Sequence, residues 1–270
     1  MTPPLVLKFG GTSLASPARV RLAAERVERH VGEGRRLAVV VSAPGRTTDL
    51  VLRWLGALEG DRRALGARRG SADRERDRAV ARGEDLSAAG LAFALASRGL
   101  SARSLTGPEA GIQVAGNHGA GRIATIRTGP VQELLEEGTI PVVSGFQGEG
   151  PTGETVLLSR GGSDITAVAL AAALGAECHL VTDVAGVHDA DPRTTPDARR
   201  LPVLDHDELV RLAEAGARVV HPEAARLARG GRVPLVIYHF EDGLPSRDTA
   251  ALAGTRVGTP GVTAVAGGLR

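Results

Sequence analysis

Short apolar runs alternate with helical patterns along most of this 270-residue chain. In that pattern, strands alternate with helices, which favours parallel strands joined by right-handed crossovers. We therefore expect one three-layer α/β/α sandwich around a central, mainly parallel sheet, built by a single domain over residues 1–270. Uninterrupted apolar runs predict its buried strands at Leu5–Phe9, Leu37–Val41, Ile140–Ser144, Glu177–Thr182 and Val233–Tyr238.

Apolar residues at helical spacing predict the helices. The first starts at Pro17 with Ser16 as its cap. Segment Arg62–Arg82 carries dense charges of both signs, which is typical of a solvated helical face. Short strands and loops are expected over Ser101–Ile126, and closing strands beyond residue 240. The other predicted elements are helices over 50–100, Pro130–Glu137, Ile165–Leu174, Asp205–Ala215 and Pro222–Ala228, and a short strand about Arg218–Val220.

Composition narrows the class of protein. The net charge is only +2, and basic and acidic residues are interspersed, which argues against a nucleic-acid partner. The longest apolar run, Ala167–Leu174, is too short to cross a bilayer, so no membrane partner is expected. A lone cysteine, Cys178, fits a reducing compartment. A strand that begins at the fifth residue leaves no room for a signal peptide, so we expect a cytoplasmic protein.

One lysine stands out. Of 33 Lys and Arg residues, Lys8 is the single lysine. A lysine ammonium is a compact point charge, whereas an arginine guanidinium is a planar fork. Lys8 precedes the turn Gly10-Gly11-Thr12-Ser13, where a point charge would suit an anion. Chance is the alternative, because one lysine must fall somewhere.

Polar and glycine-rich segments follow several predicted strands. Segments 8–13, 42–48 and 182–183 each lie where an apolar run finishes, and open parallel sheets bind ligands at that edge. Gly10-Gly11 and Gly161-Gly162-Ser163 both precede a helix, whose N-terminal N–H groups attract anions. Together they predict a polyphosphate site, although each glycine pair alone could simply make a tight turn. The chain has no Walker P-loop motif.

These segments, read together, resemble the aspartate kinases of the amino acid kinase superfamily. The resemblance covers essentially the whole chain, with the motifs in family order. They are Lys8–Ser13, Ser42–Asp49, Gly83-Glu84 with Leu86-Ser87, Gly145–Gly148, Arg160–Asp164, Thr182–Val184, Gly186-Val187, Ala190–Arg193 and Gly216–Pro222.

The resemblance implies transfer of a phosphoryl group from ATP to the β-carboxylate of L-aspartate, with Mg²⁺ bound by phosphate oxygens. Lys8 and Asp164 would be catalytic: Lys8 bridges the phosphates, and Asp164 orients Lys8 or contacts the substrate amine. Arg160 would clamp a carboxylate, and Glu84 would pair with the ammonium. The implied substrate-binding set is Ser42, Thr47, Glu84, Arg160, Gly161, Gly162, Ser163 and Asp164; the implied nucleotide-binding set is Lys8, Gly10, Gly11, Ser13, Thr182, Asp183, His188, Arg193 and Arg218. No metal ligand is implied.

Alternatives stay open for several of these residues. Glu84 could be an exposed residue of a charged helix, Arg160 a surface ion pair and Asp183 a turn residue. The chain also departs from the family pattern at three positions. Arg218 replaces the usual lysine, Ser159 replaces a glycine, and His188 replaces a tyrosine.

The family pattern also implies an organisation. An N-terminal substrate lobe would cover about residues 1–160, and a nucleotide lobe about residues 161–260. The ACT domains that usually follow would be missing, so we expect insensitivity to amino acid feedback. A homodimer and a separate regulatory subunit would be the protein partners. The alternatives are a family member with another acceptor, and a non-catalytic subunit that binds nucleotide or amino acid.

Overall fold

The computed structural model describes residues 3–58, 69–190, 195, 197–217, 219–242 and 254–258. Its strands are β1 (Leu5–Phe9), β2 (Leu37–Val41), β3 (Ala102–Leu105), β4 (Ile112–Ala115), β5 (Arg122–Ile126), β6 (Ile140–Ser144), β7 (Gln147–Glu149), β8 (Thr155–Leu157), β9 (Glu177–Thr182), β10 (Val203–Leu204), β11 (Leu235–His239) and β12 (Thr255–Val257). Its helices are α1 (Pro17–Gly32), α2 (Thr47–Leu58), α3 (Arg69–Ala96), α4 (Gly129–Glu136), α5 (Gly162–Leu174), α6 (His206–Glu214) and α7 (Pro222–Gly231), with a 3-10 turn at Thr12–Leu14.

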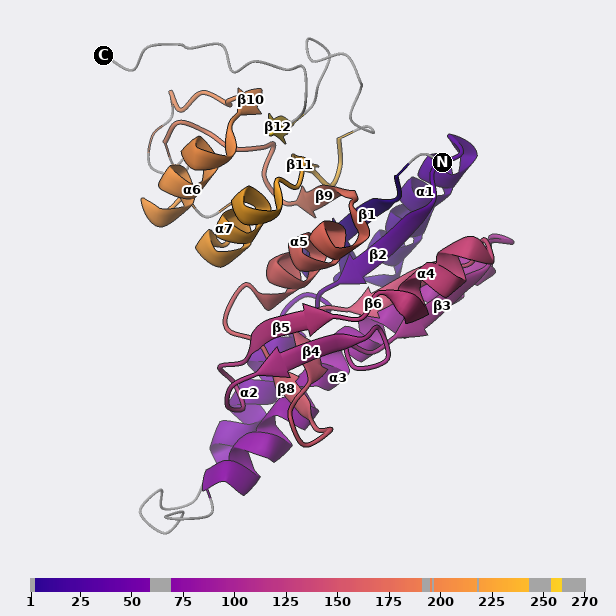
Figure 1. Ribbon diagram of the computed structural model, residues 1–270, viewed down its shortest axis with the longest axis vertical. Helices are drawn as coiled ribbons and strands as arrows, with labels where there is room; N and C mark the ends of the chain where they lie inside the picture. Colours follow the sequence, from indigo (N-terminus) through magenta and orange to yellow (C-terminus); the bar gives the residue numbers. More distant parts are fainter. Residues whose placement is uncertain are drawn as a thin grey trace.

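An eight-stranded sheet forms the centre of the molecule (Figure 1). Its order is β10-β12-β11-β9-β1-β2-β6-β3. Strand β1 lies between β2 and β9 and runs parallel to both, with Lys8 level with Val40 and Leu180. Only the pairing of β12 with β11 is antiparallel among the described strands of this sheet. The carboxyl end of β1 therefore lies near the middle of one edge of the sheet, beside the carboxyl ends of β2 and β9.

Helices cover both faces of this sheet, as the sequence predicts. Leu5 and Leu7 of β1 pack in one buried cluster with residues of α1 and α3. Val6, on the opposite face of the same strand, packs in a second cluster with residues of α4, α5, α6 and α7. Burial on both faces explains why the strands read as continuous apolar runs. The three-layer α/β/α architecture is thus confirmed.

A second, four-stranded sheet lies beside the first, with the order β5-β4-β7-β8. The pattern did not predict it, although it predicts short strands over Ser101–Ile126. Strand β8 packs on α3, and β5 packs on α5. The two sheets meet through the chain after β6, where Phe146 has a positive φ of 67°.

Two details differ from the prediction. A strand was expected about Arg218–Val220, but Val219 and Val220 form a turn, so this prediction is wrong for these two residues. Arg218 lies outside the described residues. Helix α5 begins at Gly162 rather than Ile165. The earlier start follows from Gly161, whose left-handed φ of 79° forms the N-cap of the helix.

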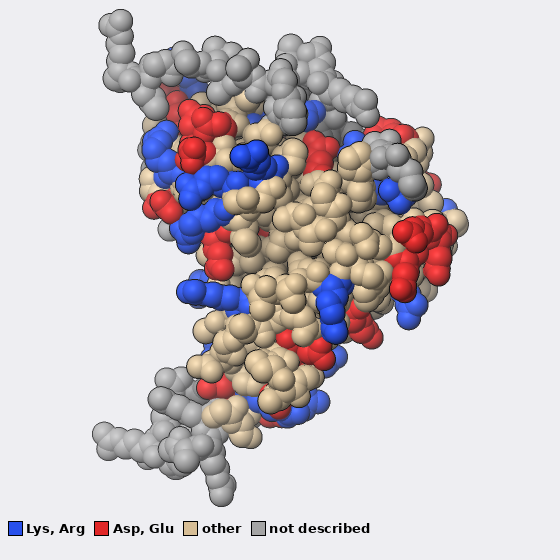
Figure 2. All heavy atoms as spheres, in the orientation of Figure 1, with Lys and Arg blue, Asp and Glu red and all other residues tan. Residues whose placement is uncertain are grey.

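Surface charges are mixed. Figure 2 shows Lys and Arg interspersed with Asp and Glu over the face in view. In the described part of the chain, no helix is long and apolar enough to cross a membrane.

A buried polar cluster lies between α1 and the strands β9 and β11. The rings of His30 and His179 meet edge to face, with centroids 5.6 Å apart, and His179 meets Tyr238 in the same way at 5.8 Å. All three side chains are buried. Burial, together with the nearby charges of His179 and Arg35, lowers the pKa of His30 to about 3. His30 is therefore neutral at pH 7 in the folded protein.

Acid should weaken the fold through His30. The unfolded chain protonates His30 below about pH 6.5, but the folded chain does so only near pH 3, so stability is lost as pH falls through this range. Between about pH 6.5 and 5, we expect wild type to lose about 1–2 kcal/mol more free energy of unfolding than His30→Phe. Urea unfolding at both pH values measures the difference. An identical pH dependence would contradict the assignment.

Candidate active site

An ion pair marks the centre of the carboxyl edge. Lys8 is the fourth residue of β1, and Asp164 lies in the first turn of α5. Lys8 Nζ lies 2.6 Å from Asp164 Oδ1, and the two side chains are 12% and 19% exposed. Partial burial strengthens the attraction, and the carboxylate fixes the direction of a long, flexible side chain. The ammonium is therefore held at the end of the central strand.

The turn after β1 packs against the loop after β2. A Cβ on Gly11 would lie 2.7 Å from the Ala43 carbonyl oxygen, so this contact excludes any side chain. Gly45 N donates to the Gly11 carbonyl oxygen at 2.8 Å. A Cβ on Gly10 would lie 3.6 Å from Lys8 Nζ, which places the Gly10 backbone beside the ammonium. Ser13 is fully buried behind the turn.

The loop over 42–49 contributes several polar groups. Ser42 N donates to the Phe9 carbonyl oxygen at 3.1 Å, which ties the start of this loop to the end of β1. Thr47 Oγ1 donates to the Pro44 carbonyl oxygen at 2.7 Å. Ser42 faces the cavity described below, whereas Thr47 does not line it; its neighbours Thr48 and Asp49 do.

Glu84 supports this loop from within the protein. It is 3% exposed, so an exposed position on a charged helix is wrong. Its Oε1 accepts from Ala43 N at 3.1 Å, and its buried Oε2 has no hydrogen-bond partner in the described structure. Burial raises the pKa of Glu84 to about 7. Glu84 does not line the cavity, so its predicted contact with an ammonium stays a prediction.

The segment Arg160–Asp164 makes a tight turn into α5. A Cβ on Gly161 would lie 2.3 Å from His221 Cγ, and one on Gly162 would lie 2.3 Å from Phe146 Cδ2. Both glycines are therefore required by close packing, with His221 on one side and Phe146 on the other. Arg160 is exposed and extends into the cavity wall beside this turn.

Two hollows meet at this turn. The first has a volume of about 420 Å³ and includes Lys8, Ser42, Arg160 and Ser163 in its lining. The second, of about 440 Å³, has a lining that includes Ala213, Gly216, Val220 and His221. Gly161 and Asp164 line both, so the Asp164 end of the ion pair lies at the junction of the two hollows. Such a junction suits a transfer of a group between two bound molecules.

The candidate nucleotide-binding residues are less closely grouped. Thr182 and Asp183 follow β9, and Thr182 Oγ1 donates to Asp183 Oδ1 at 3.2 Å. His188 is half-buried, with Nδ1 3.2 Å from the Gly186 carbonyl oxygen. None of these three lines either hollow. Arg193 and Arg218 lie outside the described residues.

Several residues that line the first hollow lie outside the predicted binding sets; Phe146 belongs to the predicted motif Gly145–Gly148, whereas those on α3 were missed from the sequence. Phe146 lines the first hollow in a left-handed backbone conformation that non-glycine residues rarely adopt, and such strain often marks a functional site. Arg76, Asp77 and Val80 of α3, with Gly119, form another part of the same lining. Asp77 falls within the segment interpreted as a solvated face, yet it is 1% exposed.

The fold and this site define a class. A parallel sheet, a glycine turn, a helix N-terminus and a lysine converge at one edge, which is the arrangement of an α/β protein that binds polyanions there. The profile of the amino acid kinase family matches residues 3–239. The chain belongs to the amino acid kinase family.

Aspartokinases are among its relatives within that family. The chain is 44% identical to aspartokinase of Geobacillus stearothermophilus over 234 residues, covering 86% of this chain and 55% of that one. It is 40% identical to aspartokinase of Thermus thermophilus over 228 residues, covering 83% and 54%. This chain thus spans about half the length of the curated relatives that it matches.

Solved structures agree with this placement. Aspartate kinase from Synechocystis superposes with a TM-score of 0.75 at 35% identity, covering 97% of this chain and 41% of that one. E. coli aspartokinase III in complex with aspartate and ADP gives 0.78 at 25% identity, covering 94% and 64%. UMP kinase from Bacillus anthracis, at 17% identity and a TM-score of 0.64, shares the fold.

The buried charge of Glu84 should lower the free energy of unfolding above neutral pH. The folded pKa of about 7 exceeds the ordinary 4.5, so the folded protein loses stability as pH rises through this range. Glu84→Gln keeps an acceptor for Ala43 N and removes the buried charge. We expect this variant to be about 2–3 kcal/mol more stable than wild type at pH 8, but not at pH 4. Denaturant unfolding at both pH values tests this; a variant less stable at pH 8 would refute it.

Proposed function

We propose that this protein is an aspartate kinase that transfers the γ-phosphoryl group of ATP to the β-carboxylate of L-aspartate. The observation that carries the proposal is the ion pair between Lys8 and Asp164, with Asp164 at the junction of two hollows. Identity of 40–44% to aspartokinases supports the choice of acceptor. The product would be 4-phospho-L-aspartate, with ADP as the leaving group.

The chemistry needs positioning and charge neutralisation more than covalent help. A carboxylate oxygen of aspartate attacks the γ-phosphorus, and the bond from that phosphorus to the oxygen it shares with the β-phosphate breaks. The acceptor is already ionised at pH 7, so the step requires no general base.

Each candidate residue has a role in this proposal. Lys8 would neutralise charge on the phosphoryl group in flight, and Asp164 would hold its ammonium in place. The backbone N–H groups of the Gly10-Gly11 turn and of the start of α5 would bind phosphate oxygens. Arg160 would clamp a carboxylate of aspartate with two parallel hydrogen bonds.

The remaining roles follow the family resemblance. Ser42 and Thr47 would hydrogen-bond the amino acid, and Glu84 would pair with its ammonium. The nucleotide would be bound by Thr182, Asp183, His188, Arg193 and Arg218. The substrate lobe would cover about residues 1–160, and the nucleotide lobe about residues 161–260.

The proposal includes Mg²⁺ bound to ATP. In the described residues, no three or more His, Cys, Asp or Glu side chains gather into a metal site. We expect the ion to be bound mainly by phosphate oxygens and water. Mg²⁺ would neutralise part of the charge that develops on the phosphates. A homodimer, a regulatory subunit and insensitivity to feedback stay predictions.

An acceptor panel tests the function. ADP release is measured with L-aspartate, L-glutamate, an N-acylated amino acid and UMP, each at saturating ATP and Mg²⁺. We expect turnover with L-aspartate at least about tenfold above every other acceptor, because Arg160 and the pocket suit a short dicarboxylate. Preference for another acceptor would refute the substrate, and ADP binding without any turnover would favour a non-catalytic subunit.

The identity of the cation should matter as much as its charge. Lys8→Arg keeps a positive charge but cannot place a compact ammonium beside Gly10. We expect kcat to fall at least about 100-fold, with the melting temperature unchanged within about 2 °C. Arg53→Lys, at an exposed site on α2, is the matched control and should keep wild-type activity. Near wild-type kcat in Lys8→Arg would contradict the role given to Lys8.

A further inference from the structure

Asp77 joins three parts of the protein around one oxygen atom. It lies on α3 and is 1% exposed. Its Oδ2 accepts from Leu157 N of β8 at 2.9 Å, from Gly119 N at 2.9 Å, and lies 3.0 Å from His118 Nδ1. A buried carboxylate is tolerated only with such partners, and removing one would leave a charge or an N–H group unpaired. Asp77 therefore fixes α3 to the small sheet and to the loop that carries Gly119.

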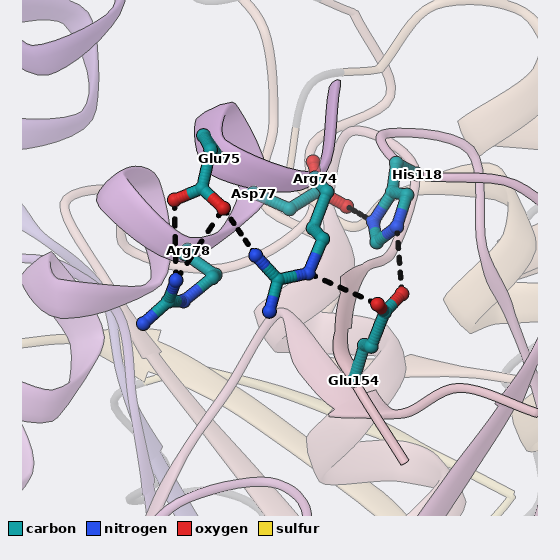
Figure 3. Close-up of polar contacts among 6 residues, drawn as sticks. All are labelled: Arg74, Glu75, Asp77, Arg78, His118 and Glu154. Carbon is teal, nitrogen blue, oxygen red and sulfur yellow. Dashed lines mark hydrogen bonds and ion pairs between the residues drawn. The ribbon is translucent and has the colours of Figure 1, made fainter. Parts of the chain in front are cut away.

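His118 links this carboxylate to a second one. Figure 3 shows its ring between Asp77 and Glu154, with Nε2 3.3 Å from Glu154 Oε2. Arg74 Nε donates to the other oxygen of Glu154 at 2.9 Å. The ring is thus held from both sides, and its Nδ1 is directed at Asp77. Nothing in the chemistry proposed above uses this chain of contacts.

Among these contact residues, Asp77 lines the first hollow, whereas His118, Glu154 and Arg74 lie behind it. Asp77, Gly119 and Leu157 form one wall of this hollow, which Lys8 and Arg160 also line. None of the three lines the second hollow, whose lining includes Asp164 and residues of α6 and α7. Ser42 and Arg160, which are assigned to the amino acid, line the first hollow and not the second, so the wall lies on the acceptor's side of the site.

Arg76 is an exposed residue of α3 beside this arrangement. Its neighbour in the chain is Asp77, and its guanidinium would come within 4.0 Å of a Cβ on Gly119. Arg76 also lines the first hollow, as Arg160 does from another element. A shift of α3 or of the Gly119 loop would move this cation relative to Arg160.

We propose that Asp77 and His118 are positioning residues that set the acceptor wall of the first hollow, and that Arg76 on this wall contributes to binding of the acidic amino acid. The proposal rests on the aspartate kinase function given above. The wall does not include the glycine turns assigned to the phosphates, so its loss raises KM for aspartate more than it lowers kcat. KM for ATP stays unchanged, which a general loss of folding would not produce.

Two substitutions of His118 separate its contacts. His118→Leu removes both nitrogen atoms of the ring. In His118→Asn, the side-chain amide nitrogen takes the place of Nδ1 and donates to Asp77. For His118→Leu we expect KM for aspartate to rise about tenfold, with KM for ATP within about twofold of wild type. For His118→Asn we expect KM for aspartate within about threefold of wild type. Arg76→Gln should raise KM for aspartate about fivefold.

A control and a second variant complete the test. Arg226→Gln changes an exposed ion pair to Glu214 that lines neither hollow, and should leave all constants unchanged. Should His118→Leu fail to fold, Glu154→Ala decides, because it removes the outer support of the ring from a partly exposed position. We expect it to raise KM for aspartate about threefold, and not KM for ATP.

The outcomes are distinct. Wild type that does not phosphorylate aspartate refutes the proposed function. If wild type is active and His118→Leu leaves KM for aspartate unchanged, the positioning role of Asp77 and His118 is refuted. Where His118→Leu does not fold, an unchanged KM for aspartate in Glu154→Ala refutes it. Equal increases in KM for aspartate and ATP, with a lower melting temperature, assign the pair a structural role alone and overturn the proposal.

Discussion

Close approach of backbone segments at the carboxyl edge is the constraint on which the rest of the site depends. Gly11 touches the Ala43 carbonyl group, Gly161 touches His221, and Gly162 touches Phe146, each with no room for a Cβ. These contacts bring the ends of β1, β2 and β6 and the start of α5 together. Only then can a lysine on the central strand reach a carboxylate on the helix, at 2.6 Å.

Electrostatics follows from this packing. Lys8 and Asp164 neutralise each other, so the edge carries a fixed ammonium without an isolated buried charge. Glu84 is the opposite case. Its carboxyl group supports Ala43 from within the protein at the cost of a raised pKa. A site that tolerates such a group trades stability for a well-placed loop, as functional sites often do.

Much of the large sheet could be predicted from the sequence. Leu5–Phe9, Leu37–Val41, Ile140–Ser144 and Glu177–Thr182 match β1, β2, β6 and β9, because strands buried on both faces leave continuous apolar runs. The ends of these strands also predicted Lys8 and Ser42 at one edge, whereas Arg160 and Asp164 were predicted from the family resemblance; their catalytic roles stay predictions. Asp77 could not be recognised in this way. Its partners are backbone N–H groups 42 and 80 residues away, and such contacts leave no local pattern.

Helix α3 carries two buried carboxyl groups on one side. Asp77 and Glu84 are about two turns apart, so both project from the same face of one continuous helix. The first fastens Gly119 and β8, and the second fastens the loop that begins at Ser42. The helix is thus a strut between two walls of the first hollow. A displacement of α3 along its axis would move both walls together. The width of the hollow and the position of Ser42 would therefore change together and not independently.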